Sequence, residues 1–358
     1  MKLPEHGANP HRLYEQAGHK QLSDVIDFSE NVHPFGPPVF LKEQWGEFYN
    51  LLSSYPDPEA EPFRSAAAEY HGVEKERVAA GNGAAEIFTW LAKRYRGKRV
   101  ALVEPAFSEY RSTLESENIH ILEISLKPES AWQLEVEDVK RQLAQCDALY
   151  ICNPHNPTGR LLGLAKLEEI AALCKGKCEL VIDEAFIDFI GEHTSFIPLL
   201  KRYPHVIIVR SMTKMYALAG LRLGYVVAES SIIRELTGAA AHWNVNGLAA
   251  AAGARCFSEE AYRERIIRAA DSERTKMEDF LEMMGCPFIP SAANFLCFQL
   301  PNPVRSEPFF HAMLEAGIVL RHTYSFKGMD GEWFRIGMKS TSAMERLRKE
   351  MQQWFKDN

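Results

Sequence analysis

Five apolar runs rich in valine and isoleucine dominate the middle of the chain. They span residues 99–105, 119–126, 147–154, 179–186 and 206–212, and each has the length of a β-strand. Because the runs are apolar at nearly every position, we expect both faces of each strand to be buried. Amphipathic stretches separate the runs. The pattern predicts an α/β fold in which helices cover a mostly parallel central sheet.

The pattern differs at the two ends of the chain. Residues 1–40 are rich in His, Asn, Pro and Gly with little periodicity, which predicts an extended arm with a short strand near 25–28. A helix is expected over 62–71, and the segment 78–95 reads as a strand end, a glycine turn and a helix. We expect such an arm to pack on the small domain or on a partner subunit.

A second, smaller α+β unit is expected after about residue 245. A long helical stretch with room for a break covers residues 248–284. The following segments predict strands over 294–300, 317–323 and 333–339, and helices over 306–316 and 342–356. The expected organisation is an arm over 1–40, a large domain over 41–245 and a small domain over 246–358.

Composition narrows the class of protein. The 358 residues are 46% hydrophobic and 25% charged, as in ordinary globular proteins, and the net charge of −7 argues against a nucleic-acid partner. No apolar run approaches the roughly 20 residues needed to span a bilayer, and the first residues lack the apolar core of a signal peptide. The seven cysteines show no framework spacing. We therefore expect a cytoplasmic protein without membrane or metal sites.

The segment 206–227 carries the first candidate chemistry. Lys214 has apolar neighbours, which disfavour its charged form and make its amine a nucleophile able to form a Schiff base with an aldehyde. The hydroxyls of Ser211 and Thr213 and the guanidinium of Arg222 suit a phosphate. Pyridoxal 5'-phosphate (PLP) is an aldehyde that carries a phosphate. From this segment alone, an ordinary loop lysine and a surface arginine remain equally good interpretations.

Further polar residues follow the apolar runs, where ligands of parallel sheets bind. The turn GNGAAE (81–86) precedes a helix whose N-terminus suits a phosphate. The string NPHNPTG (153–159) is a rigid turn that projects Asn156 as a donor. Asp183 and Glu184 end an apolar run, where a buried carboxylate needs a partner. For Asp183 that partner is a protonated pyridine nitrogen, or the residue forms a structural ion pair or a helix cap.

NPHNPTG, DEAFIDF and RSMTKMYALAGLRLGY occur in this order, and the chain resembles the fold type I PLP enzymes of the class I/II aminotransferase family. The resemblance lies in the branch of histidinol-phosphate aminotransferases and threonine-phosphate decarboxylases. It implies that Lys214 bonds to the cofactor, Asp183 pairs with its pyridine nitrogen, and Asn156 donates to its ring hydroxyl oxygen. The resemblance also implies a phosphate cup made of Gly83, Ala84, Ser211, Thr213 and Arg222.

The same resemblance assigns three more residues and shows one departure. Phe107 is similar to the aromatic residue that stacks on the ring, and Tyr55 to the one that reaches the cofactor phosphate of the neighbouring subunit in a homodimer. Arg335 resembles the arginine that clamps the substrate carboxylate, with Asn156 beside the substrate. Phe186 stands where many of these aminotransferases have tyrosine, so a phenol donor to the cofactor is absent.

Four segments look more like threonine-phosphate decarboxylase than like the aminotransferase: HGAN (6–9), SENVHPFGPP (29–38), HWNVNGLAA (242–250) and LRHTYSFKGM (320–329). They imply a second anion site from His6, Arg321 and the arm. The alternative for His6 is a mobile terminal histidine, whereas the apolar neighbours of Arg321 favour a paired, functional arginine.

These resemblances predict a homodimeric decarboxylase of L-threonine O-3-phosphate that makes aminopropanol phosphate for cobalamin biosynthesis. One alternative is an aminotransferase that acts on histidinol phosphate or a related amino acid with 2-oxoglutarate. Another is a non-catalytic, PLP-binding regulatory protein. The presence of the expected lysine, aspartate and arginine disfavours this last reading.

Overall fold

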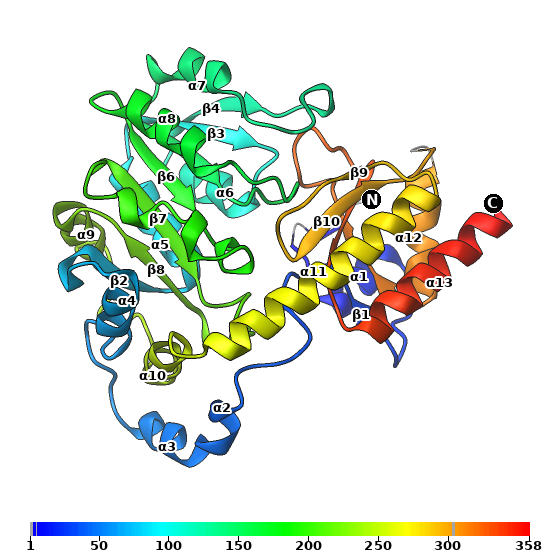
Figure 1. The fold of residues 1–358 in the computed structure, drawn as a ribbon, viewed down its shortest axis with the longest axis horizontal. Helices are drawn as coiled ribbons and strands as arrows, with labels where there is room; N and C mark the ends of the chain where they lie inside the picture. The colour runs from blue at the N-terminus through cyan, green and yellow to red at the C-terminus, as the bar shows by residue number, and fades with distance from the viewer. Residues whose placement is uncertain (1–2, 5, 303–304) are drawn as a thin grey trace.

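The computed structural model describes residues 3–4, 6–302 and 305–358 (Figure 1). Its main sheet has seven strands in the order β2-β8-β7-β6-β5-β3-β4. All neighbours pair in parallel except β8, which is antiparallel to β2 and β7. This confirms the predicted mostly parallel sheet. The strands are β2 (Val78–Asn82), β3 (Arg99–Glu104), β4 (His120–Ser125), β5 (Ala148–Cys152), β6 (Glu179–Asp183), β7 (Val206–Ser211) and β8 (Leu223–Val227).

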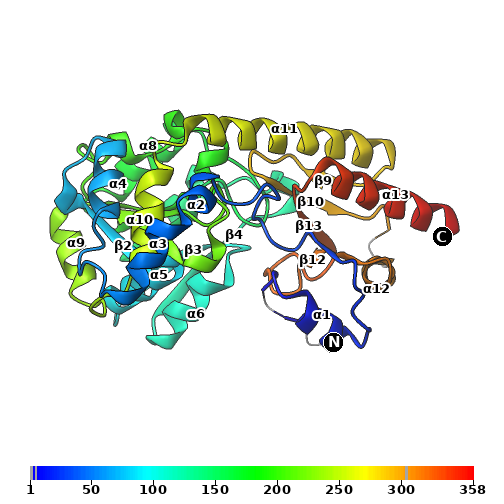
Figure 2. The ribbon, with the colours of Figure 1, turned by 90° about the horizontal axis from the view of Figure 1, so that it is seen from below.

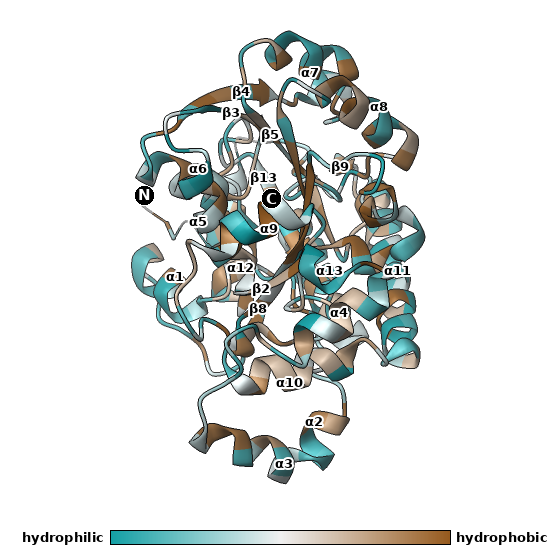
Figure 3. Cartoon of the chain, turned by 90° about the vertical axis from the view of Figure 1, so that its left-hand side faces the viewer, coloured by the Kyte–Doolittle hydropathy of each residue, from teal (hydrophilic) through white to brown (hydrophobic). Residues whose placement is uncertain are grey.

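Both faces of this sheet are buried, as the continuous apolar runs predicted. Ile151, Ile182 and Ile208 belong to one core cluster, and their neighbours Val181 and Ile207 belong to the cluster on the other face. In Figure 3 the central strands are brown and teal positions lie on the surrounding helices. The second face is covered by α5 (Gly83–Arg94), α6 (Ser108–Ser116) and α9 (Ser230–Thr237), and the first by α4 (Phe63–His71), α7 (Val136–Leu143), α8 (Leu164–Cys174) and α10 (Gly247–Cys256).

A smaller antiparallel sheet has the order β12-β13-β10-β9. Its strands are β9 (Phe288–Ile289), β10 (Phe295–Gln299), β12 (Arg321–His322) and β13 (Trp333–Gly337), accompanied by α12 (Ser306–Glu315) and α13 (Thr341–Asp357). Helix α11 (Glu260–Met283) runs from the large sheet to the small one (Figures 1 and 2). It is separated from α10 by three residues, which is the predicted break.

The single strand expected over 317–323 is instead two short strands in different sheets. Strand β11 (Ile318–Val319) pairs in parallel with β1 (Ile26–Asp27), which comes from the arm. After Leu320 the chain changes partner, and β12 pairs with β13. The sequence run is continuous, but the arm occupies the edge beside its first half, so the run divides.

The arm is less extended than predicted. Helix α1 (Pro10–Ala17) has proline in its first turn and buries Leu13, Tyr14 and Ala17. Ala17 lies four residues after Leu13 and three after Tyr14, so the three side chains share one side of the helix. The Tyr14 hydroxyl donates to the Leu314 carbonyl at 2.6 Å, which fixes α1 on α12. The proposed boundaries at 40 and 245 stay predictions.

Two short helices, α2 (Phe40–Glu43) and α3 (Trp45–Asn50), lie at the edge of the molecule beyond α10 and pack on it through Phe40 and Phe48 (Figures 1 and 3). Among the described residues, no helix combines the length and apolar character that crossing a membrane requires. Short 3-10 helices lie at Leu51–Ser53, Lys75–Arg77, Pro128–Ser130, Ile187–Phe189, Glu192–Thr194, Ile197–Leu199 and Ala219–Leu221.

Candidate active site

A cavity of about 250 Å³ lies at the carboxyl ends of the parallel strands and reaches the small sheet. Most of the candidate residues from the sequence line it, although they are spread over more than 300 positions of the chain. The lining includes His6, Ala84, Phe107, Asn156, Asp183, Ser211, Thr213, Lys214, Arg222, Arg321 and Arg335. The fold therefore brings these side chains to one site.

Lys214 follows β7, and its partly buried side chain lines the cavity. Burial lowers the pKa of its amine, while the nearby Asp183 carboxylate acts in the opposite direction. Its Nζ donates to Ser211 Oγ at 3.2 Å and lies 5.4 Å from the ring centroid of Phe186. The shift is toward the neutral, nucleophilic form of the amine, which is the direction that the apolar neighbours predicted.

The phosphate end of the cavity is built by strand pairing. Because Asn82 of β2 is paired with Leu223 of β8, the next residues, Gly83 and Arg222, are brought together. Gly83 has φ +74°, and a Cβ there would lie 2.5 Å from Arg222 Nη2, so only glycine lets the guanidinium approach the start of α5. A helix N-terminus beside an arginine and two hydroxyls suits an anion. This cradle fits the phosphate of PLP.

Asp183 is fully buried at the end of β6, and burial raises the pKa of its carboxyl group. Two donors and the Lys214 amine oppose that rise: the Tyr110 hydroxyl donates to Oδ2, and the Ala185 N–H donates to Oδ1 at 2.9 Å. A carboxylate oriented in this way suits a protonated ring nitrogen. Sequence reasoning missed Tyr110, although its place three residues after Phe107 on α6 was the available signal.

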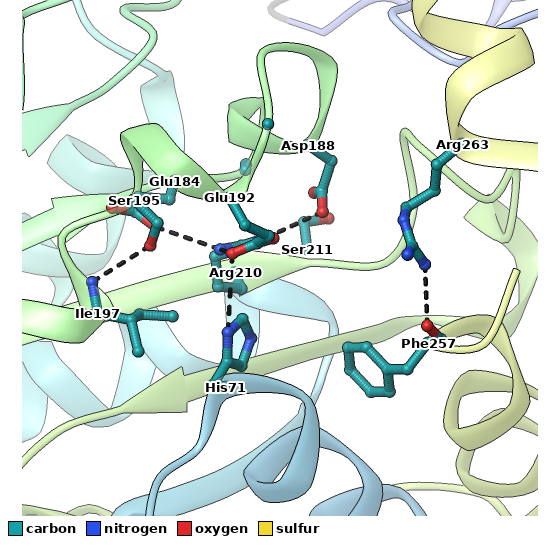
Figure 4. Close-up of polar contacts among 12 residues, drawn as sticks. His71, Glu184, Asp188, Glu192, Ser195, Ile197, Arg210, Ser211, Phe257 and Arg263 are labelled. Atoms are coloured by element: carbon teal, nitrogen blue, oxygen red, sulfur yellow. Dashed lines mark hydrogen bonds and ion pairs between the residues drawn. The ribbon is translucent and has the colours of Figure 1, made fainter. Parts of the chain in front are cut away.

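Glu184 and Arg210, the neighbours of Asp183 and Ser211, form a separate buried network (Figure 4). Arg210 Nη2 donates to Asp188 Oδ1 at 2.9 Å and to Glu192 Oε1, while Nη1 lies 3.3 Å from Glu184 Oε2. Successive strand residues point to opposite faces. Asp183 and Ser211 therefore face the cavity. Glu184 and Arg210 point to the opposite face of the sheet, where their contact links the ends of β6 and β7. The ion-pair interpretation that the sequence left open applies to Glu184.

Arg335 lies on β13 with its guanidinium buried in the cavity wall. Its Nη1 donates to Asn156 Oδ1 at 2.6 Å and its Nη2 to the Ser29 carbonyl at 2.8 Å. Its Nε has no hydrogen-bond partner among the described residues, and burial lowers the pKa of the group to about 10. A buried cation with an unused donor fits an anionic ligand such as a carboxylate.

Arg321 is paired with Arg335 across strands β12 and β13. It is also buried, and its guanidinium donates to Ser325 Oγ at 2.6 Å and to the His322 carbonyl at 3.0 Å. The Ser29 segment of the arm therefore accepts a hydrogen bond from Arg335, and the loop after β12 accepts one from Arg321. Both cations line the same cavity.

His6 lies at the mouth of the cavity, half-exposed, with its ring centroid 6.1 Å from that of Phe107. The arm beside it is attached: Ala8 N–H donates to Ser29 Oγ at 3.0 Å, and a Cβ at Gly7 would lie 2.4 Å from the Ser29 carbonyl oxygen. The close approach at Gly7 directs His6 toward the cavity. Its role in substrate binding stays a prediction.

Tyr55 does not reach the cavity of its own chain. It is 83% exposed, and its ring centroid lies 5.0 Å from that of Trp243. Its predicted contact with the cofactor of a neighbouring subunit is untested in a single chain. Among the described residues, no group of histidine, cysteine and acidic side chains is arranged to hold a metal ion.

Comparison with known proteins identifies the family to which the chain belongs. The family described as "Aminotransferase class I and II" matches residues 23–350. Threonine-phosphate decarboxylase of Salmonella typhimurium is 32% identical over 326 residues, which cover 90% of this chain and 89% of the relative. Histidinol-phosphate aminotransferase 2 of Thiobacillus denitrificans is 32% identical over 308 residues and 84% of each chain. The structure of histidinol-phosphate aminotransferase from Clostridium acetobutylicum matches with a TM-score of 0.88 at 25% identity, covering 93% of this chain and all of that one.

Proposed function

The chain belongs to the class I and II aminotransferase family and uses PLP, and from this premise we propose that it decarboxylates L-threonine O-3-phosphate. The products are CO₂ and (R)-1-amino-2-propanol O-2-phosphate, a precursor for cobalamin biosynthesis. The observation that carries the proposal is the pair of buried arginines, Arg321 and Arg335, which line the cavity from adjacent strands. Two cations at one cavity suit a substrate with a carboxylate and a phosphate.

The substrate's two anionic groups would set its orientation. Arg335, held by Asn156, binds the carboxylate, and Arg321 with His6 binds the phosphate at the mouth. Remote binding energy from the phosphate fixes the rotation about the bonds of Cα, and that rotation decides which bond breaks. This is how the same cavity could serve decarboxylation in one enzyme and transamination in another.

PLP, when bound, accepts the electron pair of the bond that breaks at Cα. The chain's own groups handle position and protons. Asp183, oriented by Tyr110 and Ala185, would accept a hydrogen bond from a protonated ring nitrogen and so favour the charged ring. Burial lowers the pKa of Lys214, which makes its amine a better proton carrier than a free lysine, and its Nζ would be the group that donates a proton to Cα once CO₂ has left.

A second candidate is an aminotransferase that acts on histidinol phosphate. The histidinol-phosphate aminotransferase of Thiobacillus denitrificans matches at the same 32% identity as the decarboxylase, which favours keeping it. It would use the same lysine and aspartate but needs 2-oxoglutarate as a second substrate. A non-catalytic regulatory role is the weakest candidate, because the cavity keeps a partly buried lysine with a lowered pKa.

The deciding experiment incubates the purified holoenzyme with L-threonine O-3-phosphate alone and measures CO₂ and aminopropanol phosphate. We expect both products in equal amounts and little of either from unphosphorylated threonine. The proposal is rejected if CO₂ is not released while histidinol phosphate and 2-oxoglutarate yield glutamate.

A homodimer is the second part of the proposal. Exposed apolar side chains gather on and around α2 and α3, at the edge of the molecule (Figure 1). They are Val39, Trp45, Tyr49, Leu51, Leu52 and Tyr55. A grouped apolar surface of this kind marks a protein interface. Burying it against a second copy would also let Tyr55 approach the partner's cofactor phosphate.

A further inference from the structure

We propose that Phe326 determines substrate specificity. Its ring keeps the guanidinium groups of Arg321 and Arg335 apart, so that the cavity prefers ligands with two separated anionic groups to ligands with one. This inference rests on the proposed function, because it concerns the doubly anionic class of substrate named there.

The starting point is an unfavourable pair of charges. Arg321 and Arg335 are directly opposite each other on antiparallel strands, and like charges in this position destabilise a sheet. Both side chains are buried, where repulsion is less screened than in water. Neighbouring groups that attract cations must therefore offset part of this repulsion, and the Asp27 carboxylate does so for Arg335.

Phe326 lies beside both cations. The Cζ of Arg321 is 5.0 Å from its ring centroid, and the Cζ of Arg335 is 5.9 Å from it. The face of an aromatic ring attracts cations, so a single ring stabilises both guanidinium groups. The ring is buried and lines the same cavity as both guanidinium groups.

Hydrogen bonds hold the two guanidinium groups in different directions. Arg335 donates to Asn156 and to the Ser29 carbonyl, on the side of the large sheet and the arm. Arg321 donates to Ser325, the residue before Phe326. Because these hydrogen bonds differ and both groups contact the Phe326 ring, each arginine would offer its own anion site. A ligand can bind to both arginines at once only if it has two anionic groups that are separated in space.

The loop that carries Phe326 has contacts with its own strand end and with the large sheet. The Phe326 N–H donates to the Thr323 carbonyl at 2.9 Å. The next residue, Lys327, places its Nζ 2.7 Å and 2.6 Å from the two carboxylate oxygens of Glu123 on β4. Glu123 also accepts from Arg111 Nη2 at 2.7 Å. The ring position therefore depends on a bridge between the small-sheet loop and the large sheet.

The test compares two ligands that lack an amino group and so cannot react. The holoenzyme is titrated calorimetrically with 3-phosphoglycerate, which carries a carboxylate and a phosphate, and with glycerate, which lacks the phosphate. We expect the wild type to prefer 3-phosphoglycerate. In Phe326→Leu the ratio of the two dissociation constants should fall about tenfold, as expected from the loss of a buried cation–π contact. The same fall in the ratio is expected for Phe326→Met, whose flexible side chain fills the space left by the ring more readily than leucine does.

Phe295→Leu is the matched control. Phe295 lies on β10, and its ring centroid is 5.5 Å from the Cζ of Arg335, so the variant also removes an aromatic ring beside that arginine. It should weaken both ligands in the same proportion and leave the ratio unchanged. An unchanged ratio in both Phe326 variants, or an equal fall in the control, overturns the specificity role and leaves the proposed function in place. A wild type without preference for 3-phosphoglycerate overturns both, since it removes the phosphorylated substrate class.

Discussion

Replacement of Arg210 by methionine should unfold the chain more readily than any other single loss of a charge described above. The wild-type side chain is 1% exposed and is surrounded by the carboxylates of Glu184, Asp188 and Glu192. Methionine would fill much of the volume but leave three acidic groups without their cation. Removing one partner from a buried ion pair typically destabilises by roughly 3–5 kcal/mol. We expect a loss in this range near pH 8.

The loss should depend on pH. Burial raises the pKa of Glu184 to about 7, although Arg210 opposes this rise. A carboxyl group with a raised pKa favours the folded state below its unfolded pKa, and this contribution is lost as the pH rises through about 7. Without Arg210 the acidic groups must protonate instead, which is easier in acid. The destabilisation of Arg210→Met should therefore be smaller near pH 6 than near pH 8.

The assay is urea unfolding at one fixed protein concentration, followed at both pH values. Arg96→Met is the control, because Arg96 forms an exposed ion pair with Glu117 and should lose only about 0–1 kcal/mol. A loss in Arg210→Met no larger than in the control would refute the argument that the network joins β6 and β7. So would a loss that is greater near pH 6.

Three further outcomes can be checked with standard assays. Lys214→Ala should abolish the adduct that borohydride traps on the holoenzyme, and an unchanged adduct would contradict its assignment. Arg335→Ala should lower kcat/KM by roughly 100-fold or more for a substrate with a carboxylate, as expected for a lost buried charge pair, and far less for one without it. Equal losses would exclude the clamp role. Trp45→Glu with Leu52→Glu should convert a dimer into monomers in sedimentation velocity, whereas Met283→Glu, which changes an exposed apolar residue elsewhere, should not.

Much of the fold was predictable because the signal was local. Each of the five apolar runs contains a strand, and the glycine turn before α5 lies where the sequence placed it. The division of residues 317–323 was not predictable, because it depends on the arm strand β1, which is almost 300 residues away. Helix α1 was missed because the prolines and histidines around it obscured the spacing of Leu13, Tyr14 and Ala17. Long-range partners, rather than local propensity, decided both cases.

The site divides in the same way. Lys214 and Asp183 are charged residues in or beside apolar runs, so their functional role can be predicted from the sequence. Tyr110 and Phe326 are an ordinary helix tyrosine and an ordinary loop phenylalanine until the fold places them beside Asp183 and the arginines. Side chains that orient other side chains carry little signal of their own. They become visible only when the distances are known.

Phe186 lies beside Lys214 and affects its amine, so we ask whether it could select between decarboxylation and transamination. Its ring lies 5.4 Å from Lys214 Nζ, so the position offers an aromatic face but no hydroxyl donor to the cofactor. The ring face favours the charged amine, whereas burial favours the neutral one and lowers its pKa overall. The lysine is thus suited to exchanging protons, which both candidate reactions require. Its basicity cannot select between them, so the selection falls to the groups that orient the substrate, Arg321 and Arg335 with Phe326 between them.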